Sequence, residues 1–248
     1  MVIGGLQKFS LLDYPEHLSA IIFTQGCNFK CQYCYHPMLV GPIKPSKFNH
    51  ISSKRKNGEK TKGHSLIPED DLFVFLKKRS GKLDAVVITG GEPTIHRDLP
   101  KFIKKIKELG FKVKLDTNGT NPKMIKKLIK DNLLDYIAMD LKTSFVKYDL
   151  VIGTQPDLEN IKKSVKIIIE SGLDYEFRTT LVPKLVEISD IKAMGEIIKG
   201  AQKWYLQKFQ SDKELVNERF TGSAVFNNRE MEKMRKQALN YVRECMVR

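Results

Sequence analysis

Short apolar runs alternate with amphipathic segments along most of the chain. Six runs rich in β-branched and aromatic residues predict buried strands, at 18–23, 84–89, 111–115, 136–139, 175–181 and 204–209. Apolar residues at helical spacing predict helices from about 68, at 98–109, about 122–130, about 158–170, roughly 188–198 and near 229–247. Helices that separate short apolar strands favour parallel pairing of those strands.

Six such units predict an α/β fold: a partial (βα)6 TIM-like barrel with parallel strands, open on one side. We expect residues 1–210 to form the barrel domain, with a basic loop inserted at about 42–66, and residues 211–248 to form a C-terminal helical extension. In βα barrels the active site lies at the carboxyl ends of the strands. Polar residues follow several predicted strands here and should converge at that end.

Three of the four cysteines lie within eight residues, just after the first predicted strand. Cys27, Cys31 and Cys34 have the spacing C-x3-C-x2-C. Three thiolates on one short loop can hold three corners of a cubane iron–sulfur cluster, which leaves the fourth iron free to bind a small molecule. The fourth cysteine, Cys245, is distant in sequence, which disfavours a four-cysteine ferredoxin-type site.

Other uses of this loop are less favoured. A zinc site stays open, because His36 could be a fourth ligand. A redox pair of Cys31 and Cys34 would leave Cys27 without a role. A disulfide is disfavoured because no secretory segment is evident. Three cysteines that are merely buried as small apolar residues are not expected in so polar a loop.

The net charge of +14 comes from 43 basic and 29 acidic residues. Most lysines fall on the predicted outer faces of helices, so nucleic-acid binding is left open but not favoured. One basic cluster, 44–62, contains seven basic residues and a single acid, Glu59. No apolar run is long enough to span a membrane, and the N-terminus does not read as a signal peptide, so we expect a cytoplasmic protein.

The cysteine spacing, with Tyr33 before the last cysteine, resembles the radical S-adenosylmethionine (radical SAM) enzymes. The sequence Thr89-Gly90-Gly91-Glu92-Pro93 after the second strand resembles the GGEP motif of that family. More narrowly, the segments 4–10, 13–15 and 24–29 resemble proteins that activate anaerobic ribonucleoside-triphosphate reductase, which are glycyl-radical-enzyme activases. The segments 116–119 and 140–142 also resemble activase motifs.

This resemblance implies a single [4Fe–4S] cluster on the three cysteines, since the basic loop has no cysteine for a second cluster. S-adenosylmethionine would bind the open iron. An electron from a donor such as flavodoxin or ferredoxin would cleave the bound S-adenosylmethionine to methionine and a 5′-deoxyadenosyl radical. That radical would take a hydrogen atom from a glycine of the partner, an anaerobic ribonucleotide reductase.

The resemblance also implies roles for the strand-end residues. Gly90 and Gly91 would let the backbone approach the cofactor, and Glu92 would meet its methionyl ammonium. The remaining expected cofactor-binding residues are Tyr33 at the adenine, Asp116, Thr117 and Asn118 near the ribose or a cation, Asp140 with Lys142 near the carboxylate, and Arg178.

Two further readings stay open. One is a radical SAM enzyme that modifies a small molecule or an RNA nucleoside, and the other is a non-enzymatic metal-cluster binding protein.

Overall fold

The computed structural model describes residues 1–40, 50–51 and 64–248. The basic residues of the 44–62 cluster lie outside these described residues. In the described part of the chain, no helix combines the length and the apolar composition that a membrane span requires.

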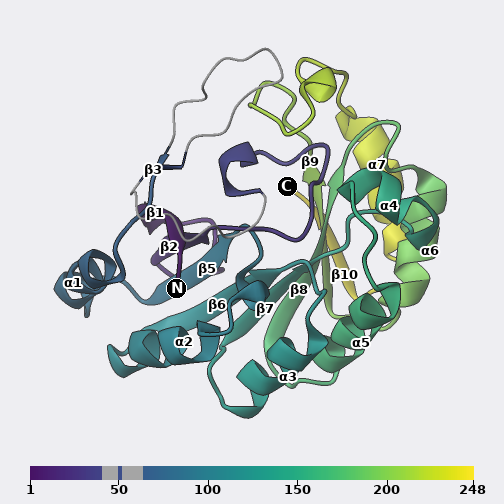
Figure 1. Cartoon of the computed structure of the whole chain (residues 1–248). Helices are drawn as coiled ribbons and strands as arrows, with labels where there is room; N and C mark the ends of the chain where they lie inside the picture. Colours follow the sequence, from purple (N-terminus) through teal and green to yellow (C-terminus); the bar gives the residue numbers. More distant parts are fainter. Residues whose placement is uncertain (41–49, 52–63) are drawn as a thin grey trace.

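The fold is built on one curved sheet of eight strands (Figure 1). Its strands, in spatial order, are β1 (Ile3–Ser10), β2 (Ser19–Thr24), β5 (Ala85–Gly90), β6 (Lys112–Thr117), β7 (Tyr136–Asp140), β8 (Asp174–Leu181), β9 (Lys203–Lys208) and β10 (Glu244–Val247). All neighbouring pairs from β2 to β10 are parallel, and β1 is antiparallel to β2. The edge strands β1 and β10 do not pair, so the sheet is an open, partial barrel. The two-residue strands β3 (His50–Ile51) and β4 (His64–Ser65) form a separate ladder.

Helices connect successive parallel strands and lie along the outer side of the sheet (Figure 1). They are α1 (Glu69–Arg79), α2 (Leu99–Glu108), α3 (Pro122–Lys130), α4 (Tyr148–Ile152), α5 (Leu158–Ile169), α6 (Ile188–Ile197) and α7 (Asn228–Ala238). Short 3-10 turns occur at Pro37–Leu39, Pro93–Ile95, Phe145–Lys147 and Glu218–Phe220. In α2, for example, Phe102, Ile103 and Ile106 are buried while its lysines face outward, which explains how a lysine-rich segment forms a stable helix.

All six predicted strands are present, and the partial TIM-like barrel is confirmed. Strand β1 has no counterpart among the six predicted strands. The closing helix predicted at 229–247 is wrong in its second half: α7 ends at Ala238, and Glu244–Val247 form β10, which pairs with β9. The segment after residue 210 is therefore not purely helical, and its last strand belongs to the barrel sheet.

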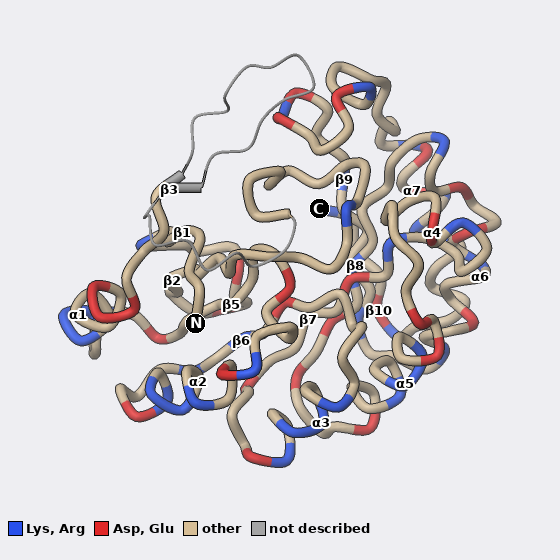
Figure 2. The backbone as a smooth tube through the Cα atoms, in the orientation of Figure 1, with Lys and Arg blue, Asp and Glu red and all other residues tan. Residues whose placement is uncertain are grey.

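The inner side of the sheet has two different walls. On β2 and β5 it is apolar, with Ile21 and Val87 packed against Tyr14. On β6, β7 and β8 it carries charged side chains. Residues near the carboxyl ends of all five strands line one cavity, and the loop that follows β2 lines the same cavity as the charged side chains. Elsewhere, Figure 2 shows basic and acidic residues interspersed along the outer helices.

Candidate active site

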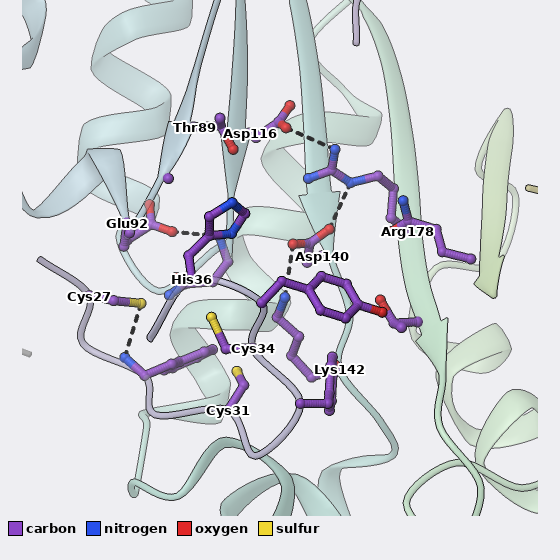
Figure 3. A pocket seen from close by; sticks show the side chains of 18 of the residues that line it. Cys27, Cys31, Cys34, His36, Thr89, Glu92, Asp116, Asp140, Lys142 and Arg178 are labelled. Carbon is purple, nitrogen blue, oxygen red and sulfur yellow. Dashed lines mark hydrogen bonds and ion pairs between the residues drawn. The ribbon is translucent and has the colours of Figure 1, made fainter. Parts of the chain in front are cut away.

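The three clustered cysteines lie on the loop that follows β2, and none of them forms a disulfide. The loop is fixed by backbone hydrogen bonds at its start and between its first two cysteines: Gly26 N–H donates to Leu39 O (3.0 Å) and Lys30 N–H to Ile152 O (2.8 Å). A turn from Cys31 O to Cys34 N–H (3.1 Å) sets the last two cysteines side by side. The backbone thus holds the three thiols on one side of the cavity (Figure 3).

Burial determines the protonation state of the three thiols. It raises the pKa of the Cys27 and Cys31 thiols to about 12, and it also raises the pKa of the Cys34 thiol. Without a metal the three cysteines are therefore protonated at neutral pH. Metal binding has to displace these protons, because the thiolate is the ligand.

The positions of the candidate metal ligands help to decide between a zinc site and an iron–sulfur cluster. Across the ranges that the structure describes, no three His, Cys, Asp or Glu side chains are grouped around a single metal ion. A mononuclear zinc site requires such a group. The cysteines of a cubane cluster each bind a different iron, so their sulfur atoms need not converge on one point. His36 also lines the cavity, and burial lowers its pKa.

The end of β5 packs directly against the cysteine loop. A Cβ on Gly91 would lie 1.8 Å from Gly26 O, and one on Gly90, whose φ is +106°, would lie 2.5 Å from Thr24 N. Only glycine fits at either position. The two segments are also joined by hydrogen bonds from Gly91 N–H to Thr24 O (2.9 Å) and from Glu92 N–H to Gly26 O (2.8 Å).

Glu92 is buried, and its carboxylate is hydrogen-bonded within the protein. Oε1 accepts from the Thr94 hydroxyl (2.5 Å), from Thr94 N–H (3.1 Å) and from the Thr117 hydroxyl (2.7 Å), while Oε2 accepts from Asn118 N–H (2.7 Å). Burial raises the pKa of Glu92 despite these donors. The side chain thus ties the end of β5 to the end of β6. Its expected contact with a methionyl ammonium stays a prediction.

Four charged residues on β6, β7, β8 and the loop after β7 form one network across the cavity wall (Figure 3). Arg178 donates to Asp116 Oδ2 (2.9 Å) and to Asp140 Oδ1 (2.7 Å), and Lys142 Nζ donates to Asp140 Oδ2 (2.9 Å). Burial disfavours the charge of Asp140, but Arg178 and Lys142 outweigh it and hold the pKa of that carboxyl well below its usual range. The predicted pair of Asp140 and Lys142 is present, and Arg178 is its structural partner.

Two buried polar atoms on the cavity wall, the Tyr33 hydroxyl and Oδ1 of the network residue Asp116, have no hydrogen-bond partner within the described residues. Lys114 Nζ lies 3.6 Å from Asp116 Oδ1, which is beyond hydrogen-bond distance. Buried polar atoms without a partner are uncommon and call for a missing ligand or water. Together with three clustered thiols on the wall of the same cavity, they fit a cluster with a polar small-molecule cofactor.

The site residues expected from sequence all line one cavity of about 460 Å³. They are Cys27, Cys31, Cys34, Tyr33, Gly90, Gly91, Glu92, Asp116, Thr117, Asn118, Asp140, Lys142 and Arg178. A volume of this size lies within the range of small-molecule sites. The structure thus brings together segments that are far apart in the sequence.

Sequence reasoning missed a further part of the wall. Thr180 on β8, Gln207 on β9, and Gln210 and Arg248, which follow β9 and β10, also line the cavity. The alternation of strands would have found Thr180, which lies on the same face as Arg178. Arg248 could not have been found, because its segment reads as helical.

Comparison with known proteins places the chain in a family. Residues 21–194 match the model of the radical SAM superfamily. The whole chain is 33% identical to 95% of the "Putative glycyl-radical enzyme activating enzyme MJ1227" of Methanocaldococcus jannaschii. A shorter match, over 59% of this chain and 43% of the relative, is 29% identical to a "Probable GTP 3',8-cyclase" of Saccharolobus solfataricus.

Among solved structures, SuiB of Streptococcus suis bound to its precursor peptide SuiA superposes with a TM-score of 0.61 at 14% identity. The match covers 92% of this chain and 48% of SuiB, and at this identity it shows the fold alone.

The chain belongs to the radical SAM superfamily, as its cysteine and GGEP motifs predict. Its resemblance to glycyl-radical-enzyme activating enzymes is also confirmed. Proteins of this superfamily use a [4Fe–4S] cluster and S-adenosylmethionine, so both cofactor predictions agree with the family.

Proposed function

We propose that this protein is a glycyl-radical-enzyme activase and that its partner is an anaerobic ribonucleotide reductase. With its cofactors bound, the site would cleave S-adenosylmethionine by one electron to methionine and a 5′-deoxyadenosyl radical, which takes a hydrogen atom from a backbone glycine of the partner. A low-potential protein such as flavodoxin or ferredoxin would supply the electron.

One observation carries the proposal. The cysteine loop, the GGEP strand end and the charged network line the same cavity, in a chain that aligns over its full length with a relative named as a glycyl-radical enzyme activating enzyme. The segments at 4–10 and 13–15, which resemble the reductase activases, favour that reductase as the partner.

The roles proposed for the residues follow from their positions. Cys27, Cys31 and Cys34 would hold the cluster. The ends of β5 and β6 are joined through Glu92. They would form the surface that binds the methionine part of the cofactor. The ammonium of Lys142 and the guanidinium of Arg178 would place positive charge near its carboxylate, and Tyr33 would lie at the adenine.

The test is anaerobic reconstitution with iron and sulfide, followed by dithionite and S-adenosylmethionine. We expect 5′-deoxyadenosine from the wild type and none from Cys31→Ala. Addition of the anaerobic ribonucleotide reductase should then give a glycyl radical, seen as its electron paramagnetic resonance signal. Formation of 5′-deoxyadenosine without that signal would contradict the activase proposal but would still support radical SAM chemistry.

A second candidate is a radical SAM enzyme that acts on a small molecule or an RNA nucleoside. The local similarity to a GTP cyclase and the net charge of +14 favour it. Under this reading, 5′-deoxyadenosine formation would rise when a nucleotide or RNA is added, and the reductase would have no effect.

A further inference from the structure

The cysteine loop is in contact with residues 209–217, the covering segment, which begins at the end of β9. The Tyr35 ring stacks on the Phe209 ring, with centroids 6.2 Å apart and planes 14° apart, and the Tyr33 ring meets Phe209 edge-on at 6.5 Å. The Tyr35 hydroxyl accepts a hydrogen bond from Gln210 N–H (2.9 Å). The roles proposed above make no use of this covering segment.

The covering segment also binds the backbone of the loop at its last two cysteines. Asn217 N–H donates to Gln32 O (2.9 Å), and Val216 N–H donates to Cys34 O (3.2 Å). Gln32 directly follows Cys31 in the sequence. These two bonds therefore fix the stretch of chain that joins the second and third cysteines.

Gln32 is bonded to the covering segment and to helix α4 at the same time. Its side-chain amide donates to Leu150 O (2.6 Å), and its backbone N–H donates to Val151 O (3.1 Å). Its Oε1 accepts from the side-chain amide of Asn217 (2.9 Å). The pair of side chains, Gln32 and Asn217, thus joins two elements across the cysteine loop.

This pair borders a second cavity, of about 350 Å³. Besides Gln32 and Asn217, the cavity is lined by Pro183, Lys184, Arg219, Phe220, Ser223 and Ala224. Its size and its polar side chains suit water. Cys31, next to Gln32, is only 8% exposed. Loss of the pair would loosen the wall between this water and the cysteine loop.

We propose that Gln32 and Asn217 are positioning residues for the cluster. Their pair would hold the chain from Cys31 to Cys34 between α4 and the covering segment, and it would keep water of the second cavity away from those ligands. One-electron reduction adds negative charge to a cluster, and water stabilises that charge, so exclusion of water keeps the reduction potential low. This inference rests on the cluster of the proposed function and holds whichever substrate the radical attacks.

The first experiment measures the reduction potential of the reconstituted protein. Gln32→Met and Asn217→Ala each remove the side-chain pair, and both should retain about four iron atoms per chain. In a dye-mediated titration followed by electron paramagnetic resonance, the ratio of reduced to oxidised cluster at a fixed potential should rise about threefold or more in each variant. Loss of the cluster absorbance in air should accelerate by a similar factor.

Asn227→Ala is the matched control. Asn227 also forms a side-chain hydrogen bond, accepting Glu230 N–H (3.0 Å) as the cap of α7, and it lines neither cavity. Its removal destabilises a helix end without touching the cysteine loop. We expect its potential and its stability in air to match those of the wild type.

The double variant tests whether the two side chains act as a pair. If they do, Gln32→Met/Asn217→Ala should change the potential no more than either single variant, because each single change already removes their bond. Effects that add in the double variant would show that the two residues act separately and would overturn the proposal.

The second experiment needs no cluster. Hydrogen exchange of the cofactor-free protein, read by mass spectrometry, should be about tenfold faster at residues 30–34 in Gln32→Met and Asn217→Ala than in the wild type and in Asn227→Ala. If both variants fail to retain a cluster, this exchange decides: acceleration confined to the loop supports the proposal, and unchanged exchange overturns it.

Two further results would overturn the proposal. An unchanged potential with faster exchange would mean that the pair serves the fold alone, and equal changes in Asn227→Ala would mean general destabilisation. Absence of a cluster in the reconstituted wild type would instead contradict the function proposed above, and hydrogen exchange would still test whether the pair holds the loop.

Discussion

Gly91 lies against Gly26 so closely that a Cβ on Gly91 would come within 1.8 Å of the Gly26 carbonyl oxygen. The same oxygen accepts the Glu92 N–H at 2.8 Å. The GGEP strand end and the cysteine loop are therefore in direct backbone contact, and each sets the position of the other.

Gly91→Ala should displace the cysteine loop. The added methyl group meets backbone and not a flexible side chain, so we expect a loss of about 1–3 kcal/mol in the free energy of unfolding and a lower iron content after reconstitution. Urea unfolding and iron analysis measure the two effects. Gly5→Ala is the matched control, because a Cβ there meets only the Phe23 side chain at an ordinary 3.5 Å. Equal behaviour of the two variants would contradict the packing argument.

Each of Cys27, Cys31 and Cys34 should be necessary for the cluster, whereas Cys245 should not. Cys245 is buried on β10, away from the three others in sequence, and lines neither cavity. We expect about four iron atoms per chain in the wild type and in Cys245→Ala, and a large loss in each of the three other alanine variants. Iron and sulfide analysis with the visible absorption spectrum checks this. Loss of iron in Cys245→Ala would revise the ligand set.

Glu92→Gln should destabilise the site before any cofactor binds. A glutamine turns its amide N–H₂ toward one of two backbone donors, Asn118 N–H or Thr94 N–H, and leaves that buried N–H unsatisfied. The expected cost is about 1–3 kcal/mol, with weaker binding of S-adenosylmethionine and an unchanged iron content.

Unfolding of the cofactor-free protein gives the decisive measurement for Glu92. If Glu92 acts only by touching the cofactor, the cofactor-free variant will be as stable as the wild type. A second signature is the pH dependence: because burial raises the pKa of Glu92 in the folded state, its ionisation lowers stability as pH rises through the folded pKa, and Glu92→Gln removes that decline.

Arg178→Met should change how stability depends on acid. The folded pKa of Asp140 is held well below its usual value of 3.8, so the unfolded chain binds more protons in that range and stability falls as pH drops below about 5. Removal of Arg178 leaves only Lys142 beside Asp140, which raises the folded pKa and makes that fall shallower. It also removes the guanidinium that is hydrogen-bonded to both Asp116 and Asp140, at a cost of about 3–5 kcal/mol at neutral pH.

Urea titrations at several values between pH 3 and pH 7 measure both effects of Arg178→Met. Lys166→Met is the control, because Lys166 is exposed and lies 3.9 Å from its nearest carboxylate, Glu170. Parallel curves for the wild type and Arg178→Met would show that Asp140 does not depend on Arg178.

The barrel could be predicted from sequence because each parallel strand is apolar enough to be recognised alone. Strands such as Ala85–Gly90 are buried along most of their length and are separated by helices with one apolar face. Strand β1 contains two glycines and few buried residues, and its pairing with β2 is broken by register shifts, so local pattern did not reveal it. Strand β10 has four residues after a helix, and only its partner β9 decides its conformation.

The cavity residues were predictable for a similar reason, since polar residues at strand ends stand out against apolar strands. How they interact was not. The Glu92 carboxylate and Asn118 N–H are 26 residues apart, and Gln32 and Asn217 are 185 apart. Contacts of this kind depend on the closed geometry of several elements, which no local pattern contains.

Strand β10 has a consequence for anyone who shortens this protein. A cut after residue 210, where the recognisable motifs end, would strip β9 of its parallel neighbour and expose a row of unpaired backbone N–H and C=O groups. It would also remove Arg248 from Glu176, to which it donates at 2.8 Å inside the barrel. The fragment would keep every cofactor motif and still gain a template for strand addition by another chain. We therefore expect the fragment to aggregate. In the full chain, the last 38 residues cover the edge of β9 and prevent this.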